Sequence, residues 1–358
     1  MIPYGRQSID DDDIAAVADV LKGDWLTQGP HVEEFETELA SEVGARHAVA
    51  FCNGTAALHA ACAAAQLGPG SIGVTSALTF AASANCLLYV GADVQFVDID
   101  PLTLNLDPRQ VPDGIDAVIA VHYAGLPVDL TSLRSRSRFI IEDASHALGA
   151  QTPDGPVGNC ARSDMCTFSF HPVKHITTGE GGAVTTNSDD LAARLRRFRH
   201  HGISPQPEKG GWYYEIESLG FNYRLTDLQA ALGTSQLKKL DRFLARRNEL
   251  AVRYREALLG LPVVLPPEAP DGWSHAYHLF VLRVAGRRGV YDELRSAGIG
   301  VQVHYVPVHH HPIYKEHASV PLPQTDAVYD ELLSLPMFPD LTDREQDTVI
   351  EALKVAVS

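Results

Sequence analysis

Lys174 is the residue of this chain best placed for covalent chemistry. It follows Ser169 by five positions, in a loop that leaves a strand-like run at residues 167–170 and continues into the glycine-rich stretch 177–182. A lysine at the carboxyl edge of a sheet binds a carbonyl compound as a Schiff base when its pKa is depressed. The alternative is an ordinary solvated lysine, which is the commonest state of any single lysine.

Two acids follow another apolar run, at residues 139–141. Glu142 and Asp143 stand at the tip of this predicted strand, and His146 comes three residues after Asp143. Carboxylates at the end of a buried strand are costly unless they are paired. Asp143 therefore suits a cationic nitrogen of a ligand, with His146 beside that ligand. A strand-end helix cap explains the same residues without any ligand.

The segment Asn53-Gly54-Thr55 follows a third predicted strand and opens a helix. Backbone N–H groups at a helix start, together with the Thr55 hydroxyl, form a cradle for a phosphate group. Ordinary capping of the helix is the alternative.

Three of the 16 histidines are adjacent, at residues 309–311. Adjacent residues do not easily share one tetrahedral ion, and no cysteine stands near them in the sequence. The chain also has no HExxH motif. We therefore predict no metal site.

Short apolar runs alternate with helix-forming segments over the first half of the chain. This alternation predicts a mostly parallel sheet covered by helices on both faces. Ligands of such sheets lie at the carboxyl ends of the strands, where the candidate residues stand. The expected strands are residues 48–51, 94–97, 117–121, 139–141, 167–170 and 183–186, and the expected helices between them are residues 54–67 and 81–89.

A helix is also expected near the start of the chain. Its acidic run at residues 10–13 is expected to form a solvated first turn, and Ile14, Val17 and Leu21 form its apolar stripe.

The pattern changes after residue 225. Residues 225–259 are rich in helix formers and predict one long helix or two in tandem. Four prolines between residues 262 and 270 mark a junction. A small α/β unit is expected beyond it, with strands at residues 277–284 and 301–304 and helices at residues 290–297 and 349–355.

Composition excludes several classes of protein. The chain has 358 residues, of which 45% are hydrophobic and 21% charged, as in soluble globular proteins of about two domains. A net charge of −16 argues against nucleic-acid binding. The absence of a long apolar stretch predicts no membrane span, and the absence of a signal core predicts no secretion. Five cysteines without CxxC spacing predict reduced thiols in a cytoplasmic protein.

Five motifs occur in order along the chain, and together they identify a family. They are residues 53–55, 79–80, 142–150, 169–174 and 220–224. In this combination the chain resembles the DegT/DnrJ/EryC/StrS family of pyridoxal-phosphate-dependent nucleotide-sugar aminotransferases over essentially its whole length. The resemblance implies a homodimer with shared active sites and an α/β, fold-type-I transferase. It implies a large cofactor-binding domain, residues 1–260, with N-terminal helices and a mostly parallel sheet between helices, and a small C-terminal α/β domain, residues 261–358.

The resemblance also implies the roles of the site residues. Lys174 would hold pyridoxal 5′-phosphate as a Schiff base, with pyridoxamine phosphate as an intermediate, and would move a proton at the substrate. Asp143 would pair with the pyridinium nitrogen, so that the ring acts as an electron sink. The other implied cofactor contacts are Phe80 on the ring face, His146 near the ring hydroxyl, Gly54, Thr55 and Ser169 on the phosphate, and Asn222 on the phosphate from the neighbouring subunit.

Within the family, residues 25–30 and 301–305 most resemble the pseudaminic-acid branch. This implies amination at C4 of UDP-2-acetamido-2,6-dideoxy-hexos-4-ulose, with L-glutamate as the amino donor. Arg224 is a candidate for the donor carboxylate, because its fork suits bidentate pairing. Trp25 and Tyr305 are core aromatics in the alternative interpretation. The expected substrate contacts are Tyr4, Asp24, Trp25, Leu26, Thr27, Arg224, Gln302, His304 and Tyr305.

Three alternatives remain. The first is an aminotransferase acting at C3 or C4 of a dTDP- or GDP-linked keto-deoxysugar. The second is a pyridoxal-phosphate enzyme of another reaction class, such as a dehydratase, although relatives that dehydrate sugars have histidine where Lys174 stands. The third is a non-catalytic regulator or binding protein with this fold, which the retention of Lys174 and Asp143 disfavours.

Overall fold

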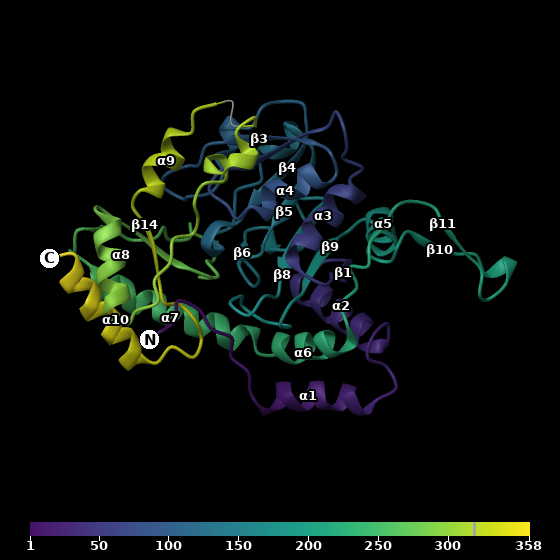
Figure 1. Ribbon diagram of the computed structural model, residues 1–358, viewed down its shortest axis with the longest axis horizontal. Coiled ribbons are helices and arrows are strands. Elements are labelled where there is room, and N and C mark those ends of the chain that lie inside the picture. The colour runs from purple at the N-terminus through teal and green to yellow at the C-terminus, as the bar shows by residue number, and fades with distance from the viewer. Residues whose placement is uncertain (318–319) are drawn as a thin grey trace.

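The computed structural model describes residues 1–317 and 320–358, and its centre is a sheet of seven strands (Figure 1). The strands are β1 (His47–Phe51), β2 (Ile72–Ser76), β3 (Asp93–Val97), β4 (Ile115–Val121), β5 (Ser137–Asp143), β8 (Met165–Ser169) and β9 (Gly182–Thr186). Their order is β1-β9-β8-β5-β4-β2-β3. β9 runs antiparallel to both of its neighbours, β1 and β8, and every other adjacent pair is parallel. The expected α/β fold with a mostly parallel sheet is therefore confirmed.

Helices pack on both faces of this sheet. They are α2 (Pro30–Val43), α3 (Gly54–Ala64), α4 (Ala82–Tyr89), α5 (Asp189–Arg199), α6 (Asp227–Leu237) and α7 (Leu240–Leu258). The first helix, α1 (Asp11–Lys22), packs on α6. Alternate residues of a strand point to opposite faces. In β1, Val49 and Phe51 therefore join a core with α3, α4 and α5, whereas Ala48 and Ala50 join a core with α2, α6 and α7. Among the described residues, no helix is both long enough and apolar enough to cross a membrane.

The first helix docks by a polar contact, and not by the expected apolar stripe. Ile14 and Leu21 are 59% and 60% exposed. Asp13 was expected to be solvated, but it is buried. It accepts hydrogen bonds from two side chains of α6, Ser235 (2.6 Å) and Gln236 (2.7 Å). The predicted stripe was wrong because α1 buries Asp13 and Val20 instead of Ile14 and Leu21.

A second sheet of three strands follows α7. It contains β12 (Val263–Val264), β13 (Phe280–Val284) and β14 (Leu332–Leu335), with α8 (Arg287–Ser296), α9 (Pro323–Tyr329) and α10 (Asp343–Ala356) beside it. The expected strand at residues 301–304 is wrong, because only Gln302 forms a single bridge, to Ser334. The backbone just before it bonds to the N-terminal segment instead, through Gly300 N–H and the carbonyl of Ile2 (2.6 Å).

Six 3-10 helices and two short hairpins complete the described secondary structure. The hairpins are β6 (Gln151–Thr152) with β7 (Gly155–Pro156), and β10 (Ile203–Pro205) with β11 (Tyr214–Ile216). The β10–β11 hairpin extends away from the body of the molecule (Figure 1). The division of the chain at residue 260 stays a prediction.

Candidate active site

A cavity of about 420 Å³ lies at the carboxyl ends of the central strands. Val121 ends β4, Asp143 ends β5 and Ser169 ends β8, and all three line the cavity. The turns that follow β1 and β2 contribute Gly54 and Phe80. The sheet thus brings together at one edge residues that lie between positions 54 and 169 of the sequence.

Lys174 lines this cavity from the loop after β8. Burial lowers the pKa of Lys174 to about 8; the Asp143 carboxylate opposes this decrease, and the buried Arg247 guanidinium adds to it. A larger fraction of the amine is therefore neutral near pH 7 than for a solvated lysine. This is the condition under which a lysine attacks a carbonyl carbon.

Asp143 is held in place by two serine hydroxyls. Ser83 on α4 donates to one carboxylate oxygen (2.7 Å), and Ser145 donates to the other (2.6 Å). These two hydrogen bonds fix the orientation of the Asp143 carboxyl group, which lines the cavity. Ser83 was missed in the sequence, because a serine within an alanine-rich helix gives no signal of its partner.

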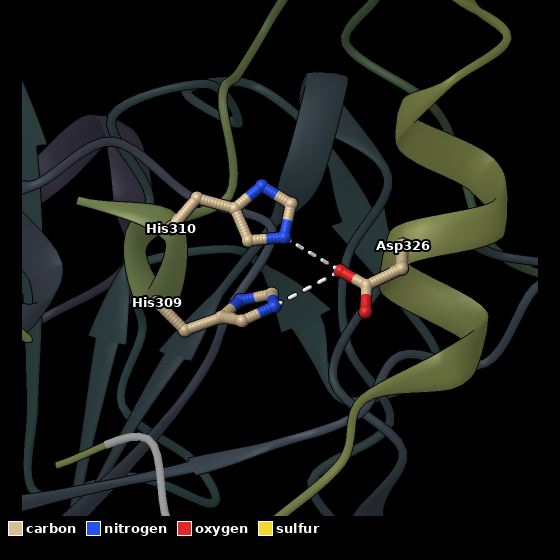
Figure 2. A group of neighbouring side chains, drawn as sticks. All are labelled: His309, His310 and Asp326. Atoms are coloured by element: carbon tan, nitrogen blue, oxygen red, sulfur yellow. Dashed lines mark hydrogen bonds and ion pairs between the residues drawn. The ribbon is translucent and has the colours of Figure 1, made fainter. Parts of the chain in front are cut away.

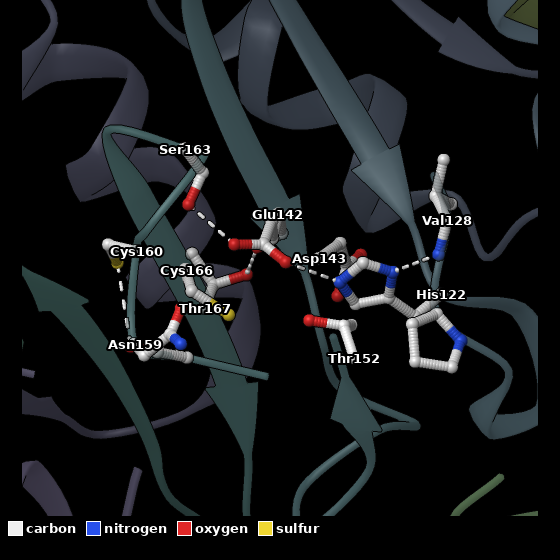
Figure 3. A network of polar contacts seen from close by, with 12 residues as sticks. His122, Val128, Glu142, Asp143, Thr152, Asn159, Cys160, Ser163, Cys166 and Thr167 are labelled. Carbon is white, nitrogen blue, oxygen red and sulfur yellow. Dashed lines mark hydrogen bonds and ion pairs between the residues drawn. The ribbon is translucent and has the colours of Figure 1, made fainter. Parts of the chain in front are cut away.

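The neighbouring Glu142 serves a different purpose. Successive residues of β5 point to opposite faces of the sheet. Glu142 accepts hydrogen bonds from the Ser163 hydroxyl and from Nε2 of His122 (2.7 Å), as Figure 3 shows. Nδ1 of His122 accepts the Val128 N–H (2.9 Å), so the ring proton lies on Nε2. Glu142 is thus satisfied within the protein, and only Asp143 faces the cavity.

The start of α3 forms an open cradle beside Ser169. Asn53 caps the helix by accepting the N–H of Ala56 (2.8 Å). The N–H groups of Gly54 and Thr55 have no partner within the helix, since they belong to its first turn. A Cβ on Gly54 would lie 2.8 Å from Cβ of Ser169, so glycine allows the two elements to close around a small anion. Capping and phosphate binding are thus compatible here.

We expect Gly54→Ala to weaken the binding of a phosphate-bearing cofactor at least about tenfold, because one displaced charge-assisted hydrogen bond costs about 1.5–3 kcal/mol. Gly289→Ala is the matched control, since it lies in helix α8 with open space around its Cβ position. That control should bind the cofactor normally and gain up to about 1 kcal/mol in stability. Equal cofactor affinity of the two variants in a titration would show that Gly54 does not contribute to phosphate binding.

The buried His146 and the partly buried Tyr305 form a pair that lines the cavity with Lys174. Nδ1 of His146 accepts the Ala124 N–H (3.3 Å), so Nε2 carries the proton and donates to the Tyr305 hydroxyl (3.0 Å). Burial lowers the pKa of His146 well below its usual value, which keeps the ring neutral. The Tyr305 proton is then available to a ligand in the cavity. The Phe80 ring, 57% exposed, lies 5.7 Å from that of Tyr305.

Not every predicted residue reaches this cavity within one chain. Trp25 is 57% exposed, so it is not a core aromatic. Arg224 lies in a separate hollow and bonds to Nδ1 of His200 (2.8 Å). The predicted residues that line the cavity are Tyr4, Gly54, Thr55, Phe80, Asp143, His146, Ser169, Lys174, His304 and Tyr305, and those outside it are Asp24, Trp25, Leu26, Thr27, Asn222, Arg224 and Gln302.

Several lining residues had no predicted role. His171 and Val173 flank Lys174 and Glu180 lies in the glycine-rich stretch, so their positions in the sequence were a usable signal. His278 lies just before β13, more than 100 residues after Lys174, and its local sequence gives no sign of a role in the site.

The residues present fit pyridoxal phosphate. The α3 cradle suits its phosphate, the fixed Asp143 carboxylate suits a pyridinium nitrogen, and the Lys174 amine suits its aldehyde. Together with the sheet, this cavity defines a fold-type-I pyridoxal-phosphate-dependent transferase. The chain belongs to the DegT/DnrJ/EryC1/StrS aminotransferase family, whose model matches residues 7–354.

Individual relatives agree with this assignment. The spore coat polysaccharide biosynthesis protein SpsC of Bacillus subtilis is 38% identical, with 99% of this chain and 96% of SpsC covered. Spr1654 from Streptococcus pneumoniae, in its pyridoxal-phosphate form, is 28% identical with a TM-score of 0.92, covering 99% and 98% of the two chains. Helicobacter pylori PseC, an aminotransferase involved in the biosynthesis of pseudoaminic acid, is 28% identical with a TM-score of 0.92 and 99% coverage of both chains.

Proposed function

We propose that this protein transfers an amino group from L-glutamate to C4 of UDP-2-acetamido-2,6-dideoxy-hexos-4-ulose, as in the pseudaminic acid pathway. The observation that carries the aminotransferase assignment is the Lys174 amine, with a pKa of about 8, in one cavity with Asp143. The choice of substrate rests on the motifs at residues 25–30 and 301–305 and on the similarity to PseC over the whole chain.

Five residues of the cavity have a task in this proposal. Pyridoxal phosphate, when bound, supplies an electron sink for the carbon that gives up a proton. Lys174 is its attachment point and then moves that proton as a base and an acid, which a pKa near 8 suits. Asp143 holds the pyridine nitrogen in its cationic form. His146 and Tyr305, which contact each other, would orient the ring oxygen, and His304, which also lines the cavity, would contact the sugar.

The proposal includes a homodimer in which Asn222 of one subunit reaches the phosphate site of the other. Asn222 lies on the surface, outside the cavity of its own chain. In the segment before it, Trp212, Ile216 and Leu219 are 82%, 64% and 90% exposed. A group of exposed apolar side chains is typical of a protein–protein interface. The expected cytoplasmic location is supported by the five cysteines, all of which are free.

The visible absorption spectrum of the purified protein, before and after addition of L-glutamate, tests the assignment. We expect a cofactor band that decays as the amino group is transferred. A band that does not change with any amino donor would support a non-catalytic regulator or a pyridoxal-phosphate enzyme of another reaction class. The absence of a band after pyridoxal phosphate is supplied would overturn the proposal.

Product analysis against a panel of keto sugars tests the acceptor. We expect turnover with the UDP-linked 4-keto sugar and amination at C4. The second candidate acts at C3 or C4 of a dTDP- or GDP-linked keto-deoxysugar. SpsC, which is 38% identical, is named for spore coat polysaccharide biosynthesis and not for pseudaminic acid, and this is the reason to test the second candidate. Faster turnover of such a sugar would replace the first candidate.

A further inference from the structure

Two adjacent histidines and a carboxylate converge outside the active-site cavity. His309 and His310 lie in a short 3-10 helix, Val308–His310, and Asp326 lies on α9. Nε2 of His309 is 2.9 Å and Nε2 of His310 is 2.8 Å from the same oxygen, Oδ1 of Asp326. Figure 2 shows both imidazole rings directed at this carboxylate. None of the three residues lines the active-site cavity.

Both halves of this cluster are fixed to the central sheet. The Val308 N–H donates to the carbonyl of Ala77 (2.9 Å), which directly follows β2. Asp98 directly follows β3 and accepts the N–H groups of Gln324 (2.8 Å) and Thr325 (2.7 Å) at the start of α9. β2 and β3 are adjacent parallel strands, so their ends are held side by side. The fold therefore preorganises the three ligand atoms.

The ligand set matches a known preference of transition metals. Imidazole nitrogen and carboxylate oxygen bind Zn²⁺ at about 2.0–2.2 Å, which places neighbouring ligand atoms of a tetrahedral site about 3.3 Å apart. The present separations of 2.8 and 2.9 Å need to open by roughly half an ångström. All the candidate atoms already lie within 4.8 Å of one another. The exposed His310 leaves a path for the ion and a fourth position for water.

The hydrogen bonding around the rings permits the exchange of protons for a metal. Nδ1 of His309 is buried and has no partner among the residues the structure describes. The ring proton of His309 is thus fixed on Nε2 only by the bond to Asp326. Moving that proton to Nδ1 gives up this one bond and exposes the Nε2 lone pair to an ion.

We propose that Nε2 of His309, Nε2 of His310 and a carboxylate oxygen of Asp326 bind one divalent transition-metal ion of the zinc class. The ion fastens the segment that follows Tyr305 to α9. It is a structural site, because its ligands lie outside the cavity that holds Lys174. His311, the third histidine of the run, does not belong to the cluster.

Zinc binding by the untagged holoenzyme tests this proposal. The protein is treated with a chelator, exchanged into buffer with zinc chloride, and assayed for bound zinc and for the midpoint of thermal unfolding. We expect one Zn²⁺ per chain and a higher midpoint. His310→Ala and Asp326→Asn should each weaken zinc binding at least about tenfold, since even outer contacts of metal sites are worth 10- to 100-fold. Asparagine keeps the acceptor oxygen, so that variant retains the contact that the metal-free protein uses.

His311→Ala is the matched control, because it removes an adjacent exposed histidine that is not one of the three proposed ligands. It should bind zinc as the parent protein does. Loss of zinc in this control equal to that in His310→Ala would mean unspecific binding by surface histidines and would overturn the proposal. So would a parent protein that retains no zinc, or an Asp326→Asn variant with unchanged affinity.

Discussion

Replacing Lys174 by alanine is expected to reduce transamination at least about 10⁴-fold, the upper range for loss of a general acid–base group, while the fold remains intact. The methyl group of alanine neither forms the covalent link nor moves a proton. The phosphate cradle of α3 does not involve Lys174, so the variant should still bind the cofactor without a covalent bond. Turnover with L-glutamate and the keto sugar measures the effect.

Borohydride reduction followed by intact-protein mass spectrometry adds a second readout. The parent protein should gain the mass of the reduced cofactor, because a Schiff base becomes a stable amine, and Lys174→Ala should not. Lys238→Ala is the control, since Lys238 is an exposed lysine outside the cavity. It should retain both turnover and the mass increase. Sugar transamination retained in Lys174→Ala would refute the assignment.

Much of the site was predictable because it lies next to strand ends. Asp143, Ser169 and Gly54 each stand at or just after an apolar run, and parallel strands bring their carboxyl ends to one edge. Tertiary contacts were not predictable in this way. Ser83 and His278 approach the cavity from segments whose local sequence is ordinary.

The fold shows the same limit at β2 (Ile72–Ser76), a strand that no sequence pattern predicted. Gly73 interrupts its apolar run, which removes the usual signal. The structure explains the glycine, since a Cβ there would lie 2.3 Å from the Leu87 side chain on α4. The close packing of α4 on β2 thus requires a glycine where a continuous apolar run would have indicated a strand.

The prediction of no metal site used sequence spacing alone. It compared His309, His310 and His311 only with one another and with nearby cysteines. Asp326 stands 16 residues beyond His310, and only the ends of β2 and β3 bring it to the two rings. Sequence spacing constrains ligands on one element, but it says little about ligands that neighbouring strands hold together.

Asp143→Ala is expected to lower turnover by about 10²–10⁴-fold. Without the carboxylate, the pyridine nitrogen loses the anion that keeps it protonated, and the ring withdraws electrons less strongly. The Lys174 link and the phosphate cradle remain, so the cofactor should stay bound. The substitution should therefore lower turnover more than cofactor affinity. The absorption change on addition of L-glutamate should become slow enough to follow after manual mixing.

Glu142→Gln is the matched control for this variant, because Glu142 is the adjacent buried carboxylate on the opposite face of β5 (Figure 3). Its glutamine must direct an N–H group toward Ser163 or His122, so the free energy of unfolding should fall by about 1–3 kcal/mol. Turnover per folded active site should not change. If Glu142→Gln slowed turnover as much as Asp143→Ala, the effect would belong to the strand end as a whole and not to a contact between Asp143 and the ring nitrogen. Near-normal turnover of Asp143→Ala would refute that contact directly.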